Sequence, residues 1–159
     1  MTADRPIIAI TMGDPASIGP EIAVKALLTE RLYEICRPLI IGDTGVFFDI
    51  VKRLGLNATI NSIKDIRNAR FVFGKPDVFD LQNVDMEQLR FGEISAMAGN
   101  ASFEAVKKTI ELALAGDVDA TVTGPINKKS INEAGHHFAG HTRNLRPLHR
   151  YKKVCHAAG

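Results

Sequence analysis

The sequence has few cysteines and no long apolar run, and each absence excludes a class of protein. Its 159 residues include two cysteines, Cys36 and Cys155, which lie far apart and form no CxxC pair. This pattern favours free thiols in a reducing compartment over a disulfide framework. No apolar stretch reaches the roughly 20 residues that span a bilayer, and the first residues lack the basic segment of a signal peptide. A cytoplasmic location is therefore expected.

Several catalytic and cofactor motifs are also missing. The segment Gly13–Glu21, GDPASIGPE, follows an apolar run but lacks the GxGxxG spacing of dinucleotide-binding folds. Its acids, Asp14 and Glu21, disfavour a bound phosphate, so a tight structural turn is the favoured interpretation. No GxSxG elbow, HExxH motif or Cys/His zinc spacing occurs. All five histidines fall within the last 24 residues, but their spacing predicts no metal site within this chain.

The net charge of +2 conceals an uneven distribution. Residues 143–159 contain five Lys or Arg and no acid, so the rest of the chain is net negative. A basic tail can bind nucleic acid or a membrane surface. The remainder has no basic stripe that would extend such a surface, so neither partner is expected.

Strand and helix patterns alternate along the chain. Three apolar runs predict buried strands at residues 6–12, 38–42 and 120–123. A helix starting at Pro20 has an apolar side that includes Ile22, and the clearest helix is expected at residues 95–114. A short strand is expected at 57–60, and the Phe-rich run at 71–76 is a candidate edge strand. The alternation predicts an α/β fold with a parallel-rich sheet.

Residues 123–142, TGPINKKSINEAGHHFAGHT, combine turn residues with polar and cationic side chains directly after a predicted strand. Asn127 can donate and accept hydrogen bonds, and Lys128 adds positive charge near the next helix. The segment ends with the imidazole of His141 beside the hydroxyl of Thr142. Open α/β sheets bind ligands at the carboxyl ends of their strands. These four side chains are therefore the candidate substrate-binding residues, and the lysines favour an anionic ligand.

Three segments, ITMGDPASIGPEI, SAMAGNASFEAVKKTIELA and TGPINK…AGHHFAGHT, together resemble the 4-hydroxythreonine-4-phosphate dehydrogenase family of vitamin B6 and pyridoxal phosphate biosynthesis. The resemblance covers about Ile7 to Thr142. The residues of these motifs are most similar to those of the branch of 4-phospho-D-threonate and D-erythronate dehydrogenases. Ser17 departs from the pattern, because the family commonly has glycine there.

The resemblance implies an NAD-dependent, metal-assisted oxidation of a phosphorylated hydroxy acid. It also implies a dimer and a fold like that of isocitrate and isopropylmalate dehydrogenases, with a cleft between two α/β domains. His141 and Thr142 match the family's substrate-contacting pair, and Lys128 and Asn127 lie in its TGP loop. The family's metal-binding histidines follow its GHT motif, and no residue of this chain matches them. NAD and a divalent metal are therefore expected from the family, with no metal ligand assigned in this chain.

The resemblance stops after Thr142. The family usually continues with Glu, whereas this chain has Arg143 and then a basic segment without family character. Residues 1–142 are therefore interpreted as the amino-terminal part of an α/β dehydrogenase, and residues 143–159 as a tail produced by a frame change. We expect no turnover from the chain alone.

Three functions remain open at this point. The first is a 4-phosphooxy-threonine dehydrogenase by descent that is now inactive. The second is an enzyme of the 4-phospho-D-threonate/D-erythronate branch whose remainder is supplied by a separate chain. The third is a non-catalytic module that binds a phosphorylated ligand.

The frame-change hypothesis predicts a specific nucleotide sequence. Read from the second base of codon 143, the DNA is expected to encode Glu directly after the GHT motif and then an apolar helix. Sequencing the gene and reading all frames checks this. A gene without such an alternative reading would exclude the hypothesis.

Overall fold

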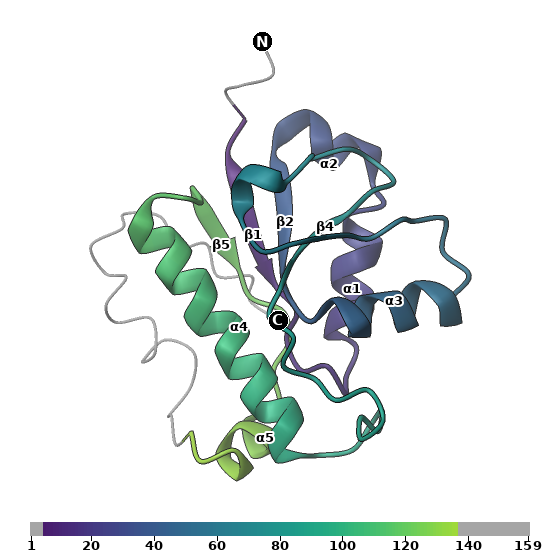
Figure 1. Cartoon of the computed structure of the whole chain (residues 1–159), viewed down its shortest axis with the longest axis vertical. Helices are drawn as coiled ribbons and strands as arrows, with labels where there is room; N and C mark the ends of the chain where they lie inside the picture. The colour runs from purple at the N-terminus through teal and green to yellow at the C-terminus, as the bar shows by residue number, and fades with distance from the viewer. Residues whose placement is uncertain (1–4, 137–159) are drawn as a thin grey trace.

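A five-stranded parallel sheet forms the centre of the computed structural model, which describes residues 5–136 (Figure 1). Its strands are β1 (Ile7–Thr11), β2 (Arg37–Gly42), β3 (Asn61–Ile63), β4 (Asp77–Asp80) and β5 (Ala120–Val122). Their order across the sheet is β3-β4-β2-β1-β5, and each neighbouring pair is parallel. The predicted α/β fold with a parallel sheet is confirmed.

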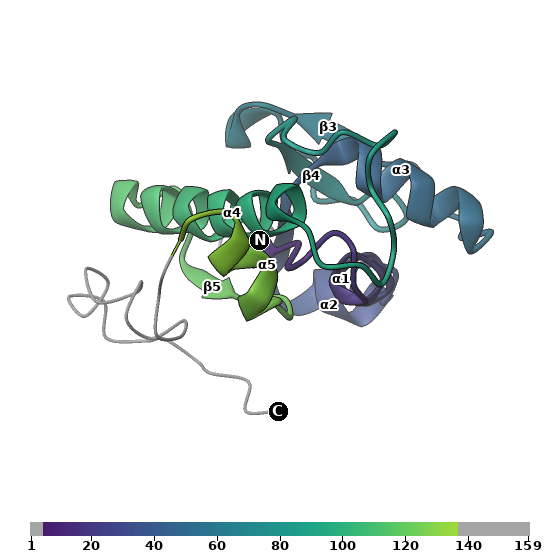
Figure 2. The same cartoon turned by 90° about the horizontal axis from the view of Figure 1, so that it is seen from below.

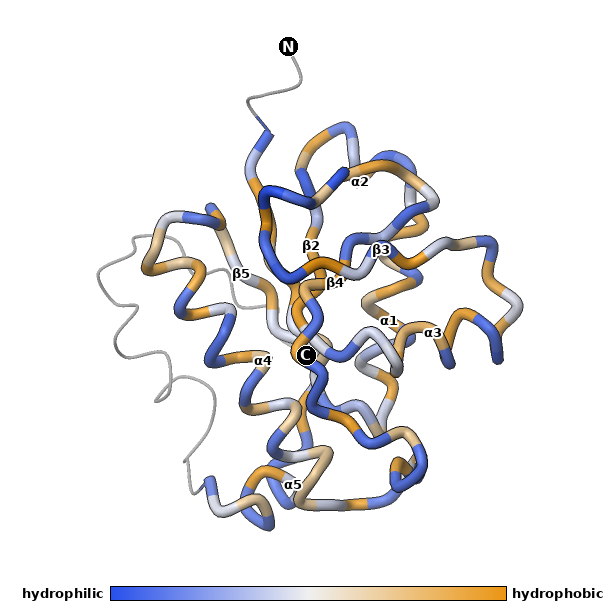
Figure 3. The backbone as a smooth tube through the Cα atoms, viewed as in Figure 1, coloured by the Kyte–Doolittle hydropathy of each residue, from blue (hydrophilic) through white to orange (hydrophobic). Residues whose placement is uncertain are grey.

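Helices cover the two faces of this sheet unequally. The described helices are α1 (Gly19–Ala26), α2 (Glu30–Ile35), α3 (Thr44–Arg53), α4 (Ala96–Ala115) and α5 (Lys128–Glu133), with a 3-10 turn at Ile66–Asn68. Viewed from below, α4 lies on one side of the sheet, and α1 and α2 lie on the other (Figure 2). Ala9, Leu39 and Ile41 belong to the core on the α4 side, whereas Met12 and Ile40 pack with residues of α1 and α3. Apolar segments concentrate in the strands and in the helices beside them (Figure 3). None of the described helices has the length and hydropathy to cross a bilayer.

Strand β5 joins the sheet through contacts that are distant in sequence. The backbone N–H of Ile7 donates to the Asp119 carboxylate at 2.7 Å, and the Asp119 N–H donates to the Ile7 carbonyl at 2.9 Å. These bonds fix the register in which Ile8 lies opposite Ala120. The carboxyl ends of β1 and β5 consequently lie at the same edge.

Several local predictions were wrong. The third strand forms at Asn61–Ile63 rather than at residues 57–60. Residues 71–76 form a turn with a single isolated bridge between Val72 and Lys75, and the strand that follows, β4, lies inside the sheet. Ile22 is 50% exposed, because α1 packs through Ala23 and Val24. At Phe71, φ is +51°, so the chain turns where a strand was expected.

Small residues let α4 pack closely on its neighbours. The Ser95 hydroxyl caps the helix by accepting from the Ala98 N–H at 3.1 Å, and Gly116 ends it with φ +79°. Ala101 and Ala105 are fully buried. At Gly99, a Cβ would lie only 1.9 Å from the Ser130 carbonyl oxygen of α5. The absence of a side chain at this position therefore allows α5 to dock.

We expect Gly99→Ala to destabilise the protein, although alanine favours a helix over glycine by about 0.8–1.0 kcal/mol. Overpacking against a backbone atom typically costs about 1–3 kcal/mol. Urea unfolding measures the free energy, and hydrogen exchange in α5 locates the effect. Lys107→Ala, at an exposed position of the same helix, serves as the control and is expected to change stability by less than about 0.5 kcal/mol. Equal stability of Gly99→Ala and the wild type would contradict this packing argument.

Candidate functional site

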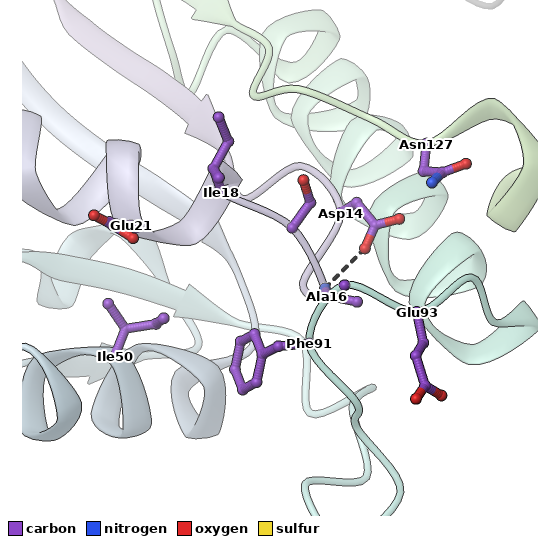
Figure 4. Close-up of a pocket in the computed structure, with 10 residues that line it drawn as sticks. Asp14, Ala16, Ile18, Glu21, Ile50, Phe91, Glu93 and Asn127 are labelled. Atoms are coloured by element: carbon purple, nitrogen blue, oxygen red, sulfur yellow. Dashed lines mark hydrogen bonds between the residues drawn. The ribbon is translucent and has the colours of Figure 1, made fainter.

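A cavity of about 360 Å3 opens at the carboxyl ends of β1 and β5 (Figure 4). It is lined by Asp14, Ala16, Ser17, Ile18 and Glu21 from the loop and first turn after β1, Ile50 of α3, Phe91, Gly92 and Glu93 from the segment before α4, and Asn127 after β5. Two loops that the sequence analysis singled out, one after each strand, therefore contribute to one cavity. Ligands of open α/β folds bind at such an edge.

The two loops are held together by their backbones. The Thr11 hydroxyl accepts from the Gly124 N–H at 2.9 Å, and the Asp14 N–H donates to the Pro125 carbonyl at 2.9 Å. Gly13 has φ +74°, and a Cβ there would lie 2.4 Å from the Pro125 oxygen. A Cβ on Gly124 would lie 2.6 Å from the backbone carbonyl oxygen of Thr11. Only glycine fits at these two positions, because each peptide chain contacts the other directly.

The segment before α4 is attached to the same loop. The Gly92 N–H donates to the Ala16 carbonyl at 2.7 Å. Phe91 forms part of the cavity wall, and the guanidinium of Arg53 lies 4.3 Å from the centre of its ring. The side chain of Glu93, from the same segment, extends along the cavity (Figure 4).

Asp14 is almost completely buried, at 1% exposure. Its carboxylate accepts from the Ala16 N–H at 2.8 Å, and burial raises its pKa above the usual value. The nearby Ser130 hydroxyl partly offsets this rise in pKa. That hydroxyl is buried and has no hydrogen-bond partner at ordinary distance among the described residues.

The loop after β1 does not form a phosphate cradle. Its Ala16 N–H is bound to the Asp14 side chain, and its Ser17 N–H donates to the Asp14 carbonyl at 3.1 Å. The carboxylates of Glu21 and Glu93 add negative charge, and no Lys or Arg among residues 5–136 lines the cavity. These groups suit hydroxyl, amide or cationic parts of a ligand better than a phosphate.

The structure describes two of the four predicted substrate-binding residues. Asn127 lines the cavity, and its side-chain oxygen caps α5 by accepting from the N–H groups of Lys129 and Ser130 at 2.9 and 3.2 Å. Lys128 is exposed in the first turn of α5 and does not line the cavity. His141 and Thr142 lie outside the described residues, as does the tail at 143–159. Their roles stay predictions.

A contact at the end of the described chain was not anticipated. The imidazole of His136 stacks on the Phe103 ring with centroids 3.8 Å apart. Its Nε2 atom lies 2.9 Å from the Asn100 side-chain oxygen. This histidine therefore anchors the chain on α4 immediately before the segment that contains the GHT motif.

The described residues do not by themselves provide a metal site of the kind that the family resemblance implies. Within residues 5–136, no group of three or more His, Cys, Asp or Glu side chains could hold a metal ion. In the loop after β1, the N–H groups of Ala16 and Ser17 are bound to Asp14 and are therefore not free to bind a dinucleotide pyrophosphate. Cys36 is buried and burial raises its pKa, which disfavours the reactive thiolate.

Other lining residues carried no signal in the sequence. Ile50 belongs to an ordinary amphipathic helix, and Phe91 and Glu93 lie in an irregular segment. The segment with Phe91 and Glu93 is attached to the loop after β1 by the Gly92–Ala16 hydrogen bond, which joins residues far apart in the chain. The loop after β1 could be identified from its GDP turn, but the burial of Asp14 could not.

Comparison with known sequences matches residues 34–157 to the family described as "Pyridoxal phosphate biosynthetic protein PdxA". A protein of Clostridium botulinum (strain Hall) named "Putative D-threonate 4-phosphate dehydrogenase" is 43% identical over 148 residues, which cover 93% of this chain and 44% of that protein. A protein of the same name from Symbiobacterium thermophilum is 48% identical over 138 residues, covering 87% of this chain and 41% of its own length.

Solved structures agree with these matches. A 4-hydroxythreonine-4-phosphate dehydrogenase from Burkholderia phymatum aligns with a TM-score of 0.86 and 40% identity, over 91% of this chain and 43% of its own. The corresponding enzyme from Klebsiella pneumoniae aligns with a TM-score of 0.85 and 34% identity, over 94% and 45%. The chain thus spans less than half the length of these relatives. On sequence and fold together, it belongs to the PdxA family.

Proposed function

We propose that this chain is part of an NAD-dependent dehydrogenase that oxidises a phosphorylated hydroxy acid of the D-threonate 4-phosphate class. The observation that carries the proposal is that Asp14 and Asn127, from the family's GDP and TGP loops, line one cavity at the strand ends. The names of the relatives at 43–48% identity favour this substrate over 4-hydroxythreonine-4-phosphate. The 4-phospho-D-threonate/D-erythronate branch is therefore preferred over a 4-phosphooxy-threonine dehydrogenase.

The distribution of charge favours two binding regions, one for the hydroxyl-bearing part of the substrate and one for its phosphate. The cavity presents carboxylates and the Asn127 amide, which suit the hydroxyl-bearing part of a ligand. Lys128 and Lys129 are exposed on the first turn of α5, next to Asn127, where positive charge favours an approaching phosphate. In this proposal His141 and Thr142 contact the substrate beyond that turn. In this proposal the described residues bind and orient the substrate, and a bound metal would supply Lewis-acid chemistry and NAD the hydride acceptor.

The chemistry of Asp14 supports a functional role. An asparagine would keep the side-chain oxygen that accepts from Ala16, and it would not be ionised. The aspartate instead places a carboxylate in a buried position, and burial raises its pKa. A residue that lowers stability where a neutral isostere would fit is typical of a functional site.

Binding is expected to distinguish the candidate substrates. D-threonate 4-phosphate should raise the melting temperature of the purified chain more than 4-hydroxythreonine-4-phosphate does. Ligand at about 100 times its Kd stabilises by about 2.7 kcal/mol. Lys128→Ala is expected to reduce the effect by about 0.5–1 kcal/mol. Lys52→Ala, an exposed lysine of α3, is the control and should leave it unchanged. NADH absorbance in the same samples separates an enzyme from a binding module, and the absence of any shift with either compound would argue against the proposal.

Asp14→Asn is expected to stabilise the protein at neutral pH. Because the pKa of Asp14 is raised on folding, the folded state favours the protonated form, and stability is lost as the pH rises from the unfolded value of 3.8 through the folded pKa. The advantage of the variant should therefore disappear below about pH 3.8. Urea unfolding at several pH values measures this.

Asp65→Asn provides a control of opposite sign. Hydrogen bonds from Arg67 lower the pKa of Asp65 to about 2, so its contribution is present above the unfolded value and is lost as the pH falls. A wild type more stable than Asp14→Asn at neutral pH would show that Asp14 is a structural residue.

A further inference from the structure

An irregular segment, residues 82–95, connects β4 to α4 and supplies Phe91, Gly92 and Glu93 to the cavity. We call this segment the strap. It contains no helix or strand, so its path over the molecule depends on contacts with other elements. These contacts differ between the start of the strap and the part that meets the cavity.

The start of the strap is fixed by a buried carboxylate. Asp43, at 5% exposure, accepts from the backbone N–H groups of Asn83 and Val84 at 2.8 and 2.9 Å. The same carboxylate caps α3 by accepting from the Gly45 N–H at 2.8 Å. Hydrogen bonds to an ionised acceptor are stronger than neutral ones. The strap and α3 therefore begin from one shared anchor.

Near the cavity, the strap is held at the surface of α3. The guanidinium of Arg53 lies 4.3 Å from the centre of the Phe91 ring, within the range of a cation–π contact. The Nε atom of Arg53 lies 2.6 Å from the Asp49 carboxylate one turn earlier in α3. This ion pair orients the planar guanidinium toward the ring. The side chain of Arg53 is nevertheless 56% exposed, so this attachment is weaker than the buried anchor at Asp43.

The contact between Arg53 and Phe91 affects the cavity directly. Ile50 and Arg53 are three residues apart in α3, so they lie on the same side of that helix. Ile50 and Phe91 both supply apolar surface to the cavity, whereas Asp14 and Asn127 supply polar groups (Figure 4). A ring that Arg53 holds on α3 therefore keeps a fixed place relative to Ile50.

We propose that Phe91 contacts the carbon chain of the bound substrate and that Arg53 is its positioning residue. The identity of the ligand rests on the proposed function, whereas the role of Arg53 in holding the strap does not. Without the guanidinium, the ring and the strap around Gly92 would sample other positions. A ligand would then have to order them when it binds, and ordering side chains and loops weakens affinity.

The test compares Arg53→Leu with the wild type in the full chain. The Gly92 amide, which donates to the Ala16 carbonyl at 2.7 Å, should exchange its hydrogen at least about threefold faster in the variant. Calorimetry should give a Kd for D-threonate 4-phosphate about three- to tenfold higher. Arg53→Lys keeps a cation near the ring and should lie closer to the wild type in both measurements.

Lys108→Leu is the matched control. The Lys108 ammonium lies 2.7 Å from the Glu111 carboxylate and 5.8 Å from the centre of the Phe79 ring, but neither Lys108 nor Phe79 lines the cavity. This substitution also removes a cation from an ion pair and from an aromatic ring. It should leave both Gly92 exchange and the Kd unchanged.

A double-mutant cycle shows whether Arg53 acts through Phe91. In a Phe91→Leu background, Arg53→Leu should change the Kd by less than about twofold, because the ring that it holds is absent. Independent effects of the two substitutions would overturn the proposal, as would wild-type Gly92 exchange in Arg53→Leu or equal effects of Arg53→Leu and Lys108→Leu. A wild type that binds neither phosphorylated compound would refute the proposed function and the substrate contact of Phe91. Gly92 exchange would still decide the role of Arg53 in that case.

Discussion

The direct contact between the backbones after β1 and β5 is the constraint on which the site depends. The Thr11–Gly124 and Asp14–Pro125 hydrogen bonds bring two peptide segments within contact distance, and glycine at positions 13 and 124 leaves space for them. This junction sets the direction of the chain that leads to Asn127. Through the Gly92–Ala16 bond it also holds the segment before α4. Three of the four parts of the sequence that line the cavity are thus joined by a few main-chain hydrogen bonds.

The cavity and the first turn of α5 differ in charge, and they would therefore interact with different parts of a ligand. Buried Asp14 and the neighbouring carboxylates make the cavity acidic, while the lysines of α5 lie on the exposed surface beside it. An anionic substrate would therefore be oriented with its phosphate away from the cavity. Within residues 5–136, no group of three or more His, Cys, Asp or Glu side chains could hold a metal ion, so under the proposed function the described part would position the substrate.

Local patterns predicted the elements that are determined locally. The buried strands, the long helix α4 and the TGP loop were identified from runs of apolar residues, helical spacing and turn residues. The Phe-rich run at 71–76 was misread, because Phe71 adopts a positive φ of 51° and the chain turns there instead of pairing. Burial of Asp14, exposure of Ile22 and the His136–Phe103 stack depend on neighbours far along the chain. Composition and spacing contain no information about such neighbours.

The bonds between Ile7 and Asp119 join residues 112 positions apart, and this separation affects how the molecule is made. Strand β1 lies between β2 and β5, so it has both neighbours only after most of the chain has left the ribosome. During synthesis, β1 therefore lacks its β5 neighbour until residues 120–122 have been made. Such non-local pairing slows folding and lengthens the time for which an unpaired strand edge is exposed.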